Sequence, residues 1–297
     1  VSGRHRYLLP RTAEGGPDGR GRCGRNWPRT EEVDVRRLTD TDVDVVVLQR
    51  PEEIALTERW LGRRPGRDVP AVFVEHNAPR PAAVDSVHPL AERGDIPIIH
   101  VTDFNKLMWD NGIAPTAVIA HGMADPGDLY VGDIAGAAAM INEPLRRRRV
   151  VGADLLGELA AATPIEVWGI GSEDLDVPGV TGRGDVPSAR LLPEIARRRV
   201  YLHTARWTSL GMSLVEAMFL GMPVVAVAAT MAPLVVPPEA GVVSADITTL
   251  ATALATFTAD RPAAEIAGKA ARAHALAHFG LDRFLAEWDD VIESVCA

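Results

Sequence analysis

Hydrophobic and polar positions along this chain form blocks of two kinds. Short, continuous apolar runs rich in Val, Ile and Ala are bounded by Gly, Pro or polar residues, which is typical of strands covered on both faces of a parallel sheet. Longer segments between these runs place apolar residues three and four positions apart, as amphipathic helices do. Strands that alternate with helices in this way predict an α/β fold built on parallel sheets.

The pattern predicts strands and helices from residue 43 to the end of the chain. The expected strands are Val43–Leu48, Val69–Val74, Ile96–Val101, Ala117–Ile119, Ala137–Ile141, Ile165–Ile170, Val200–His203, Pro223–Ala228 and Gly241–Val243. The expected helices are Pro51–Leu61, Asp103–Asn111, Ala153–Ala161, Ser188–Arg197, Gly211–Leu220, Ile247–Thr258, Pro262–Phe279 and Leu281–Val295.

The beginning of the chain and the segment Ser172–Gly184 lack this pattern. Val1–Leu9 is expected to be the end of a helix, while Arg11–Thr30 and Ser172–Gly184, both rich in Gly and polar residues, are expected to be loops. The glycines of Arg11–Thr30 do not predict a phosphate-binding P-loop, because no predicted strand precedes them and the P-loop lysine is absent. A doubly wound domain usually opens with a strand and a Gly-bearing turn, so the first N-terminal strand is expected to be missing here.

A segment that contains Gly and Pro, Asp125–Gly136, separates two similar halves and is the predicted linker. Residues 1–124 are expected to form one Rossmann-like domain and residues 125–280 a second. The last helix, within 281–297, is expected to pack back toward the first domain. Ligands of open parallel sheets bind beyond the carboxyl ends of the strands, so the site is expected in a cleft that the two domains face.

Composition narrows the class of protein. The 297 residues are 47% hydrophobic and carry a net charge of -9, which fits a globular chain with a sizeable core and argues against a general nucleic-acid-binding protein. Cys23 and Cys296 stand near opposite ends and form neither a disulfide framework nor a zinc motif, so a reducing cytoplasm is the expected location. No apolar run is long enough for an integral membrane segment, and no signal peptide is visible.

The segment Val200–Ala228 carries the clearest chemistry of the chain. It reads as a strand, a polar loop, a helix and a second strand, with Gly221 placed to end the helix and Pro223 to prevent its continuation. A glycine at the start of a helix that follows a strand leaves backbone N–H groups free at the positive end of the helix dipole. Such an end is suited to an anion.

Three residues at this helix start, Gly211, Met212 and Ser213, are therefore candidates for anion binding through their amides. Glu216 follows about one turn later, where an ionised carboxylate could accept two hydrogen bonds from a diol. A local alternative is open for Glu216, because Ser213-x-x-Glu216 also fits a capping box in which the carboxylate reaches back to a backbone N–H.

Three stretches of sequence resemble one known family. WTSLGMSLVEAMFLGMPVVA, residues 207–226, resembles the donor-site signature of retaining, metal-independent glycosyltransferases of the GT-B fold, family 4-like and of an actinobacterial type. Glu216 matches the second Glu of the family's Glu-x7-Glu pattern, whereas Thr208 stands in the place of the first. VIAHGM, residues 118–123, resembles the hinge that closes the first domain in that family.

The third stretch, NEPLRRRRVVGADLL at residues 142–156, resembles the element whose basic residues hold the donor pyrophosphate. Arg146 and Gly152 match its Arg and Gly, while its Lys falls on Val151, so that contact is either lost or supplied by Arg149 or Arg147. Arginine forks suit phosphate oxygens. The alternative, an ordinary solvated run of charges, stays open.

The resemblance implies a two-domain GT-B enzyme with hexosyltransferase activity. It would move a sugar from a nucleotide-diphospho-sugar to an acceptor hydroxyl, with no metal or other cofactor, and would have no nucleic-acid partner. The implied donor-binding residues are Arg146, Arg149, Gly171, Thr208, Gly211, Met212, Ser213 and Glu216, and the implied catalytic residues are His76 and Arg146.

Several assignments have alternatives in the sequence itself. His76 ends a predicted strand, as do His100, His121 and His203, and histidines at such positions are often structural. Glu75 is a weaker candidate for a general base. Because Thr208 replaces a carboxylate, the chain could also be a glycosyltransferase-like protein that binds nucleotide sugars without turnover. A nucleotide-sugar epimerase is a third, weaker reading.

Overall fold

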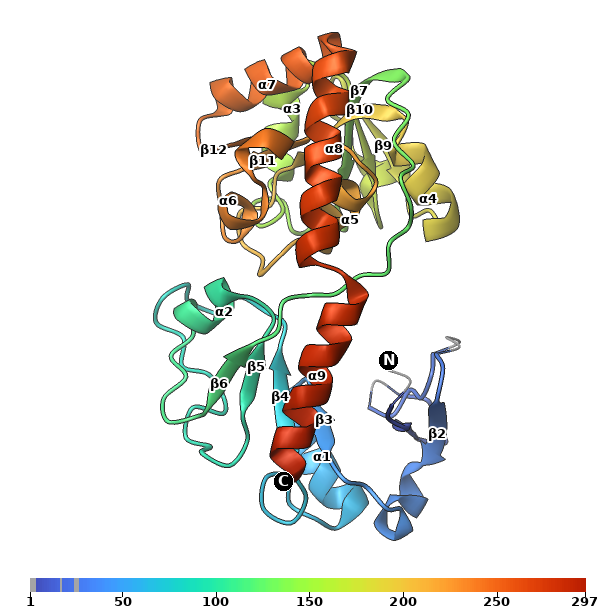
Figure 1. Cartoon of the computed structure of the whole chain (residues 1–297), viewed down its shortest axis with the longest axis vertical. Helices are drawn as coiled ribbons and strands as arrows, with labels where there is room; N and C mark the ends of the chain where they lie inside the picture. Colours follow the sequence, from blue (N-terminus) through green and yellow to red (C-terminus); the bar gives the residue numbers. More distant parts are fainter. Residues whose placement is uncertain (1–3, 17, 24–26) are drawn as a thin grey trace. The chain divides into compact units, whose positions relative to one another are not determined.

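A computed structural model describes residues 4–16, 18–23 and 27–297 (Figure 1). The chain forms two compact units, one made of Val1–Gly122 with Asp282–Ala297 and the other of Met123–Leu281. The first unit therefore contains both ends of the chain, and the second unit is one continuous segment. The sequence placed the corresponding boundaries after residues 124 and 280.

The first unit contains a parallel sheet of four strands in the order β3-β4-β5-β6. Its strands are β3 (Val46–Leu48), β4 (Ala71–Glu75), β5 (Ile98–His100) and β6 (Thr116–Val118), and its helices are α1 (Glu52–Leu61), α2 (Asp103–Met108), most of α9 (Leu281–Cys296) and the 3-10 helix Val35–Asp40. One face of β4 and β5 packs against Phe284 and Trp288 of α9 through Val72 and Ile99. Phe73 and Ile98 lie on the other face of these two strands, in a cluster with Leu90, so β4 and β5 are covered on both faces.

The beginning of the chain is where the sequence-based prediction is wrong. The sequence predicts the end of a helix over Val1–Leu9. Residues 1–3 lie outside the described residues, and the rest of this segment leads into a strand, β1 (Tyr7–Arg11), which pairs in parallel with β2 (Thr30–Asp34). Leu8 of β1 joins an apolar cluster with Trp60. Within the described residues this two-stranded sheet is separate from the sheet of four strands.

The free edge of β3 is a further feature of the first unit. Among the described residues β3 pairs only with β4, so the backbone on its other side has no strand partner. Val47, in the middle of this edge strand, is 42% exposed.

The second unit contains a parallel sheet of six strands in the order β12-β11-β10-β7-β8-β9. Its strands are β7 (Ile134–Met140), β8 (Ile165–Trp168), β9 (Val180–Gly184), β10 (Arg198–His203), β11 (Val224–Val227) and β12 (Gly241–Ser244). Its helices are α3 (Leu156–Leu159), α4 (Ser188–Ile195), α5 (Met212–Phe219), α6 (Ala232–Val235), α7 (Ile247–Ala259), α8 (Arg261–His278) and the 3-10 helices Ala153–Leu155, Ser172–Asp174 and Pro238–Ala240. β9 corrects the prediction that all of Ser172–Gly184 is a loop.

Helices cover both faces of this sheet (Figure 1). Helices α5 and α8 pack on the face that contains Tyr201, and α3 and α7 pack on the face that contains Leu202. The neighbouring residues Tyr201 and Leu202 point to opposite faces because side chains alternate along a strand. α5 ends as the sequence predicts, with Gly221 in the left-handed region at φ 85°.

The strand order of the second unit reverses between β7 and β10. From β7 the chain runs to β8 and β9 on one side, and then returns to β10, β11 and β12 on the other side. This reversal is a topological switch point, and the loops that leave the two strands there part in opposite directions. Ligands of open α/β sheets bind at such a point, beyond the carboxyl ends of the strands.

The chain enters and leaves the second unit at one place. Met123 N–H donates a hydrogen bond of 2.9 Å to the carbonyl of Phe279, and Met123 forms an isolated bridge with Gly280. In the described parts of the chain, no helix combines the length and apolarity needed to cross a membrane.

Candidate functional site

The amino end of α5 lies directly beyond β10 at the switch point of the second unit. Gly211 is the N-cap residue and supplies no side-chain hydrogen bond to the helix. The N–H of Leu214 bonds to the carbonyl of Gly211 at 2.9 Å, whereas the N–H groups of Met212 and Ser213 have no hydrogen-bond partner among the described residues. These two free donors at the positive end of the helix can hold an anion.

Glu216 lies one turn into α5, and its side chain is half-buried. Within the described residues its carboxylate makes no hydrogen bond and no ion pair, so the capping box with Ser213 does not form. Burial raises the pKa of Glu216 above its usual value. A half-buried carboxylate that no protein group satisfies, beside free helix N–H donors, is the arrangement expected of a ligand-binding residue.

His203 explains why a glycine precedes α5. A Cβ atom at Gly211 would lie 2.4 Å from the Cε1 atom of the His203 ring. This ring is buried at the end of β10, and burial lowers the pKa of His203 to about 4. This position favours a structural role for His203, in which the neutral ring packs against the start of α5.

The basic loop that follows β7 lies beside this helix because β7 and β10 are neighbours. Arg146 and Arg149, the two arginines expected to hold phosphate, are both paired with carboxylates. The Arg146 guanidinium contacts Glu143, and Arg149 Nη1 lies 3.2 Å from Asp154. Both arginine side chains are more than two-thirds exposed, and exposed pairs of this kind are weak, so both cations stay available to a stronger anion.

Two further arginines of this loop, Arg147 and Arg148, have no ion-pair or hydrogen-bond partner for their side chains in the described part of the chain. Arg147 is half-buried and Arg148 is exposed. The free positive charge of the loop is therefore concentrated on these two residues, and Arg147 was only a substitute candidate in the sequence-based reading.

Asp154 and Arg206, which the sequence did not single out, join the basic loop to the loop before α5. Arg206 makes a bidentate pair with Asp154, at 2.6 and 3.1 Å. Its backbone N–H also donates to the carbonyl of Val150 at 2.9 Å, and the Thr204 hydroxyl donates to the carbonyl of Val151 at 2.7 Å. The two loops thus form one folded body at the carboxyl ends of β7 and β10.

Thr208 and Gly171 complete the expected donor-binding set. Thr208 lies half-buried in the loop before α5, and its hydroxyl has no hydrogen bond to any described residue. Gly171 follows β8, the other neighbour of β7, in the left-handed region at φ 74°, with open space where a Cβ would stand. All of the expected donor-binding residues therefore belong to loops or helix starts beyond β7, β8 and β10.

His76 belongs to the first unit, where it follows β4. Its Nε2 atom lies 3.0 Å from Oε1 of Gln49, and desolvation lowers the pKa of His76. His121 follows β6. Burial, and then the proximity of His76, lower the pKa of His121 to about 4. Both imidazoles thus follow the carboxyl ends of strands of the same sheet.

Glu75 and His100 have structural partners in the same unit. Glu75 is buried; it accepts a hydrogen bond of 2.5 Å from the N–H of Asn77 and lies 3.3 Å from Nε2 of His88. Burial alone would raise the pKa of Glu75, but the bonds from His88 and Asn77 lower it, which is unfavourable for a general base. His100 is fully buried and bonded through Nε2 to Asn111 at 2.9 Å.

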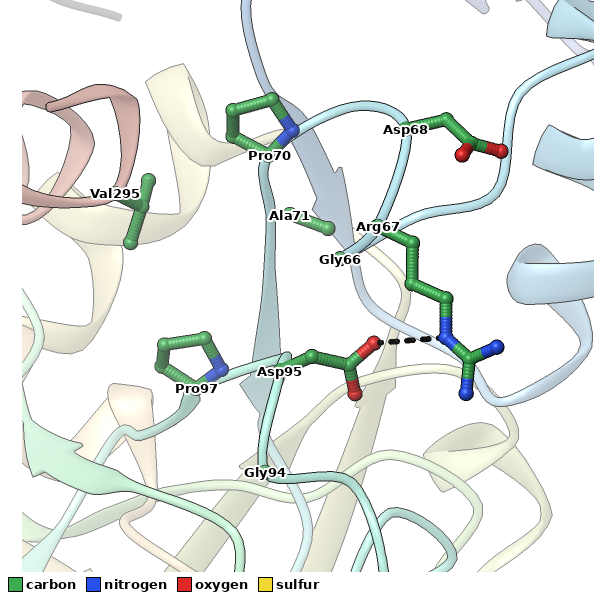
Figure 2. A pocket seen from close by; sticks show the side chains of 9 residues that line it. All are labelled: Gly66, Arg67, Asp68, Pro70, Ala71, Gly94, Asp95, Pro97 and Val295. Carbon is green, nitrogen blue, oxygen red and sulfur yellow. Dashed lines mark ion pairs between the residues drawn. The ribbon is translucent and has the colours of Figure 1, made fainter.

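A pocket of about 320 Å³ lies at the opposite ends of β4 and β5, lined by residues that include Arg67, Pro70, Asp95 and Val295 (Figure 2). Arg67 reaches across it to Asp95 at 3.8 Å, as Figure 2 shows. It contains none of the expected site residues. Among the described residues, no group of three or more His, Cys, Asp or Glu side chains could hold a metal ion.

One family model matches part of the second unit. Residues 180–274, which run from β9 into α8, match the family model of glycosyl transferases group 1. This segment contains Thr208, the start of α5 and Glu216. A search of curated protein sequences found no match.

Solved structures show the fold of the chain. TarM of S. aureus, in a structure with fondaparinux, α-GlcNAc-glycerol and UDP, has a TM-score of 0.68 and 14% identity over 84% of this chain and 55% of its own. HepE of Anabaena in complex with UDP-glucose has a TM-score of 0.66 and 18% identity, over 89% and 86% of the two chains. Sucrose-phosphate synthase of Thermosynechococcus elongatus has a TM-score of 0.66 and 14% identity, over 91% and 81%.

The chain spans about half the length of the TarM structures that it matches. The predicted fold class is confirmed: the two units with parallel sheets have the GT-B architecture of two Rossmann-like domains, and the second unit carries the segment that matches glycosyl transferases group 1.

Proposed function

We propose that this chain is a glycosyltransferase that transfers a sugar from a nucleotide-diphospho-sugar to an acceptor hydroxyl. The proposal rests on Glu216, a half-buried carboxylate that has no protein partner among the described residues and lies one turn from two free helix N–H groups. This pair of features matches a nucleoside diphosphate, which has a ribose diol to donate hydrogen bonds and phosphates to accept them. Its position within the matched segment supports the same assignment.

The proposed chemistry uses charge that the chain itself supplies. The leaving diphosphate would be held by the amides of Met212 and Ser213 and by the arginines that follow β7. Catalysis then consists mainly of orienting the donor and stabilising the charge on its leaving group. We propose that transfer retains the anomeric configuration and needs no metal, with Arg146 and His76 as the residues nearest to the reaction and a hexose as the sugar. The cytoplasm remains the predicted location.

Glu216→Ala tests whether Glu216 binds the nucleotide. We expect nucleoside diphosphate binding to weaken by about 1.5–3 kcal/mol, because a hydrogen bond to a charged group is lost. Isothermal titration calorimetry with UDP is the first measurement, since structures of TarM and HepE have been solved in complex with UDP. Unchanged affinity in this variant would argue against the assignment.

A protein that binds nucleotide sugars without turnover is the second candidate, and Thr208 is the observation that favours it. A neutral hydroxyl stands where the resemblance expects a carboxylate, and a neutral group binds sugar hydroxyls less strongly than a charged one. Assays of sugar hydrolysis and transfer over a panel of nucleotide sugars, with and without EDTA, separate the two candidates. Binding without product across the panel favours the second, and product that disappears in EDTA contradicts metal independence.

A further inference from the structure

Two histidines share one turn at the carboxyl end of α8. We propose that His274 and His278 form a two-ligand binding site for a first-row transition metal ion, namely Ni²⁺, Cu²⁺ or Zn²⁺. They are four positions apart, so they project from the same face of the helix. Their ring centroids lie 4.2 Å apart and the ring planes are inclined by 37°.

The distance between the rings suits chelation. Metal–nitrogen bonds of about 2.0–2.1 Å place two nitrogens on one ion roughly 3 Å apart. Imidazole rings with centroids at 4.2 Å can present nitrogens at this separation after small rotations of the side chains. The helix backbone fixes the spacing of the two side chains, so little further ordering is needed on binding.

Both rings are free to ligate. In the described part of the chain, neither His274 nor His278 makes a hydrogen bond or an ion pair with a protein group. Three other histidines do have such partners: His5 is paired with Asp289, His76 with Gln49, and His100 with Asn111.

The ligand type selects the class of ion. Neutral imidazole suits Ni²⁺, Cu²⁺ and Zn²⁺, whereas Mg²⁺ and Ca²⁺ prefer oxygen ligands. With two protein ligands, water completes the coordination. His278 is the last residue of α8, and the next residue, Phe279, is buried and accepts the hydrogen bond from Met123. A bound ion would therefore fix the last turn of α8 where the chain leaves the second unit.

Thermal unfolding of the untagged full chain tests the site. An ion that binds the folded state raises Tm, so we expect excess NiCl2 or ZnCl2 to raise Tm and MgCl2 to leave it unchanged. His274→Ala and His278→Ala should each abolish the shift. A shift that persists in either variant would overturn the proposal, and so would the absence of any shift in the wild-type chain.

A register variant is the matched control. His278→Ala combined with Leu276→His keeps all eight histidines but places the pair two positions apart, on different faces of the helix. Leu276 is exposed, so this change leaves the core intact. We expect no metal-dependent shift in this variant, and an equal shift would show that the number of histidines, and not their arrangement, is responsible.

A second measurement does not depend on unfolding. A sub-stoichiometric amount of Cu²⁺ should broaden the imidazole NMR signals of His274 and His278 before those of the other histidines. Broadening centred on His76 and His121 would contradict the proposal. UDP affinity should be the same in the two alanine variants as in the wild-type chain, so this site stands or falls separately from the proposed function.

Discussion

Glu216 shows how a single residue can serve binding at a cost to stability. Burial raises the pKa of Glu216, so the folded state disfavours its charged form. A carboxyl group whose pKa is higher in the folded state than in the unfolded state stabilises the folded protein only while it is protonated. This stabilisation is fully present below the pKa of the unfolded state and is lost as pH rises through the pKa of the folded state. At pH 7 the ionised carboxylate therefore destabilises the folded protein that has no ligand.

Glu216→Gln should accordingly raise the Tm of the ligand-free protein at pH 7 while weakening UDP binding. The neutral amide has no charge to desolvate, and it is a poorer acceptor for a diol. Thermal unfolding and calorimetry on the same preparations give both values. A variant that melts below the wild-type chain at pH 7, with no ligand present, would contradict this account of Glu216.

Three histidines with lowered pKa values make the protein sensitive to mild acid; His100 and His203 are buried, and His121 is half-buried. Burial lowers the pKa values of His100, His121 and His203 to about 4. Stability that depends on a lowered histidine pKa is present above the unfolded value of 6.5 and is lost as pH falls from there to about 4. Each histidine adds up to about 1.4 kcal/mol of lost stability per pH unit in this window.

Urea unfolding between pH 7 and pH 4.5 should therefore show a steep fall in the free energy of unfolding. His203→Asn should reduce the slope of the free energy of unfolding against pH by the amount that corresponds to the uptake of about one proton. This holds whatever the substitution does to stability at pH 7. Tryptophan fluorescence can follow the transition. A free energy that stays constant across this range, or an unchanged slope in the variant, would show that these histidines are not held neutral.

At the residue level, the sequence predicted a site at Glu216 and the start of α5, which stays a prediction, but it did not predict all of the partners of the arginines. Arg146 is paired with a neighbour three positions away, while Arg206 is paired with Asp154, 52 positions away. The first pair could have been found from the i, i+3 spacing. The second depends on β7 and β10 becoming neighbours in the sheet, which no local pattern specifies.

At the level of elements, Gly152 is the point where two loops meet. It has φ 72°, and a Cβ there would lie 2.0 Å from the carbonyl oxygen of Thr204. Gly152→Ala should therefore cost at least about 2 kcal/mol, from left-handed strain and overpacking together. UDP binding should weaken as well, because the loops after β7 and β10 are displaced.

Gly171→Ala is the matched control for stability. Gly171 has nearly the same φ, 74°, but nothing lies within 4 Å of the added Cβ. Only the conformational cost of about 1 kcal/mol remains. Chemical denaturation measures both variants, and equal losses would show that the contact with Thr204 is unimportant.

The strands that the sequence did not predict share a physical cause. β1 contains Pro10, β2 is largely acidic, and β9 contains two glycines, all of which are unfavourable for strands. They become strands because a neighbouring strand or an apolar cluster is available, as when β9 pairs with β8. Local propensity is overridden by tertiary context at these places, whereas the apolar strands at the centre of each sheet were recognised.

At the level of the whole molecule, the second unit is a contiguous segment whose two ends meet. Met123 and Phe279 are bonded to each other, and all of the expected donor-binding residues lie between them. A domain with adjacent ends and its own core can in principle fold alone. The alternation of strands and helices was enough to predict two such domains. The sequence did not show that the first and last residues of the second unit lie next to each other.

We therefore expect the fragment 123–281 to fold by itself and to bind UDP within about threefold of the full chain, a difference of less than 1 kcal/mol. Circular dichroism and calorimetry test the two parts of this expectation. Glu216→Ala within the fragment is the control for specific binding. A folded fragment without UDP affinity would show that residues of the first unit are needed for nucleotide binding.

The free edge of β3 has a consequence for handling the protein in solution. An unpaired strand edge with exposed apolar side chains is a template on which another polypeptide can add a strand, and natural proteins usually protect such edges with charge, proline or a covering segment. Val47 provides neither charge nor proline at the middle of β3, and it is 42% exposed. Self-association of concentrated samples is thus expected to begin at this strand, and a lysine at position 47 is the substitution of first choice for preventing it.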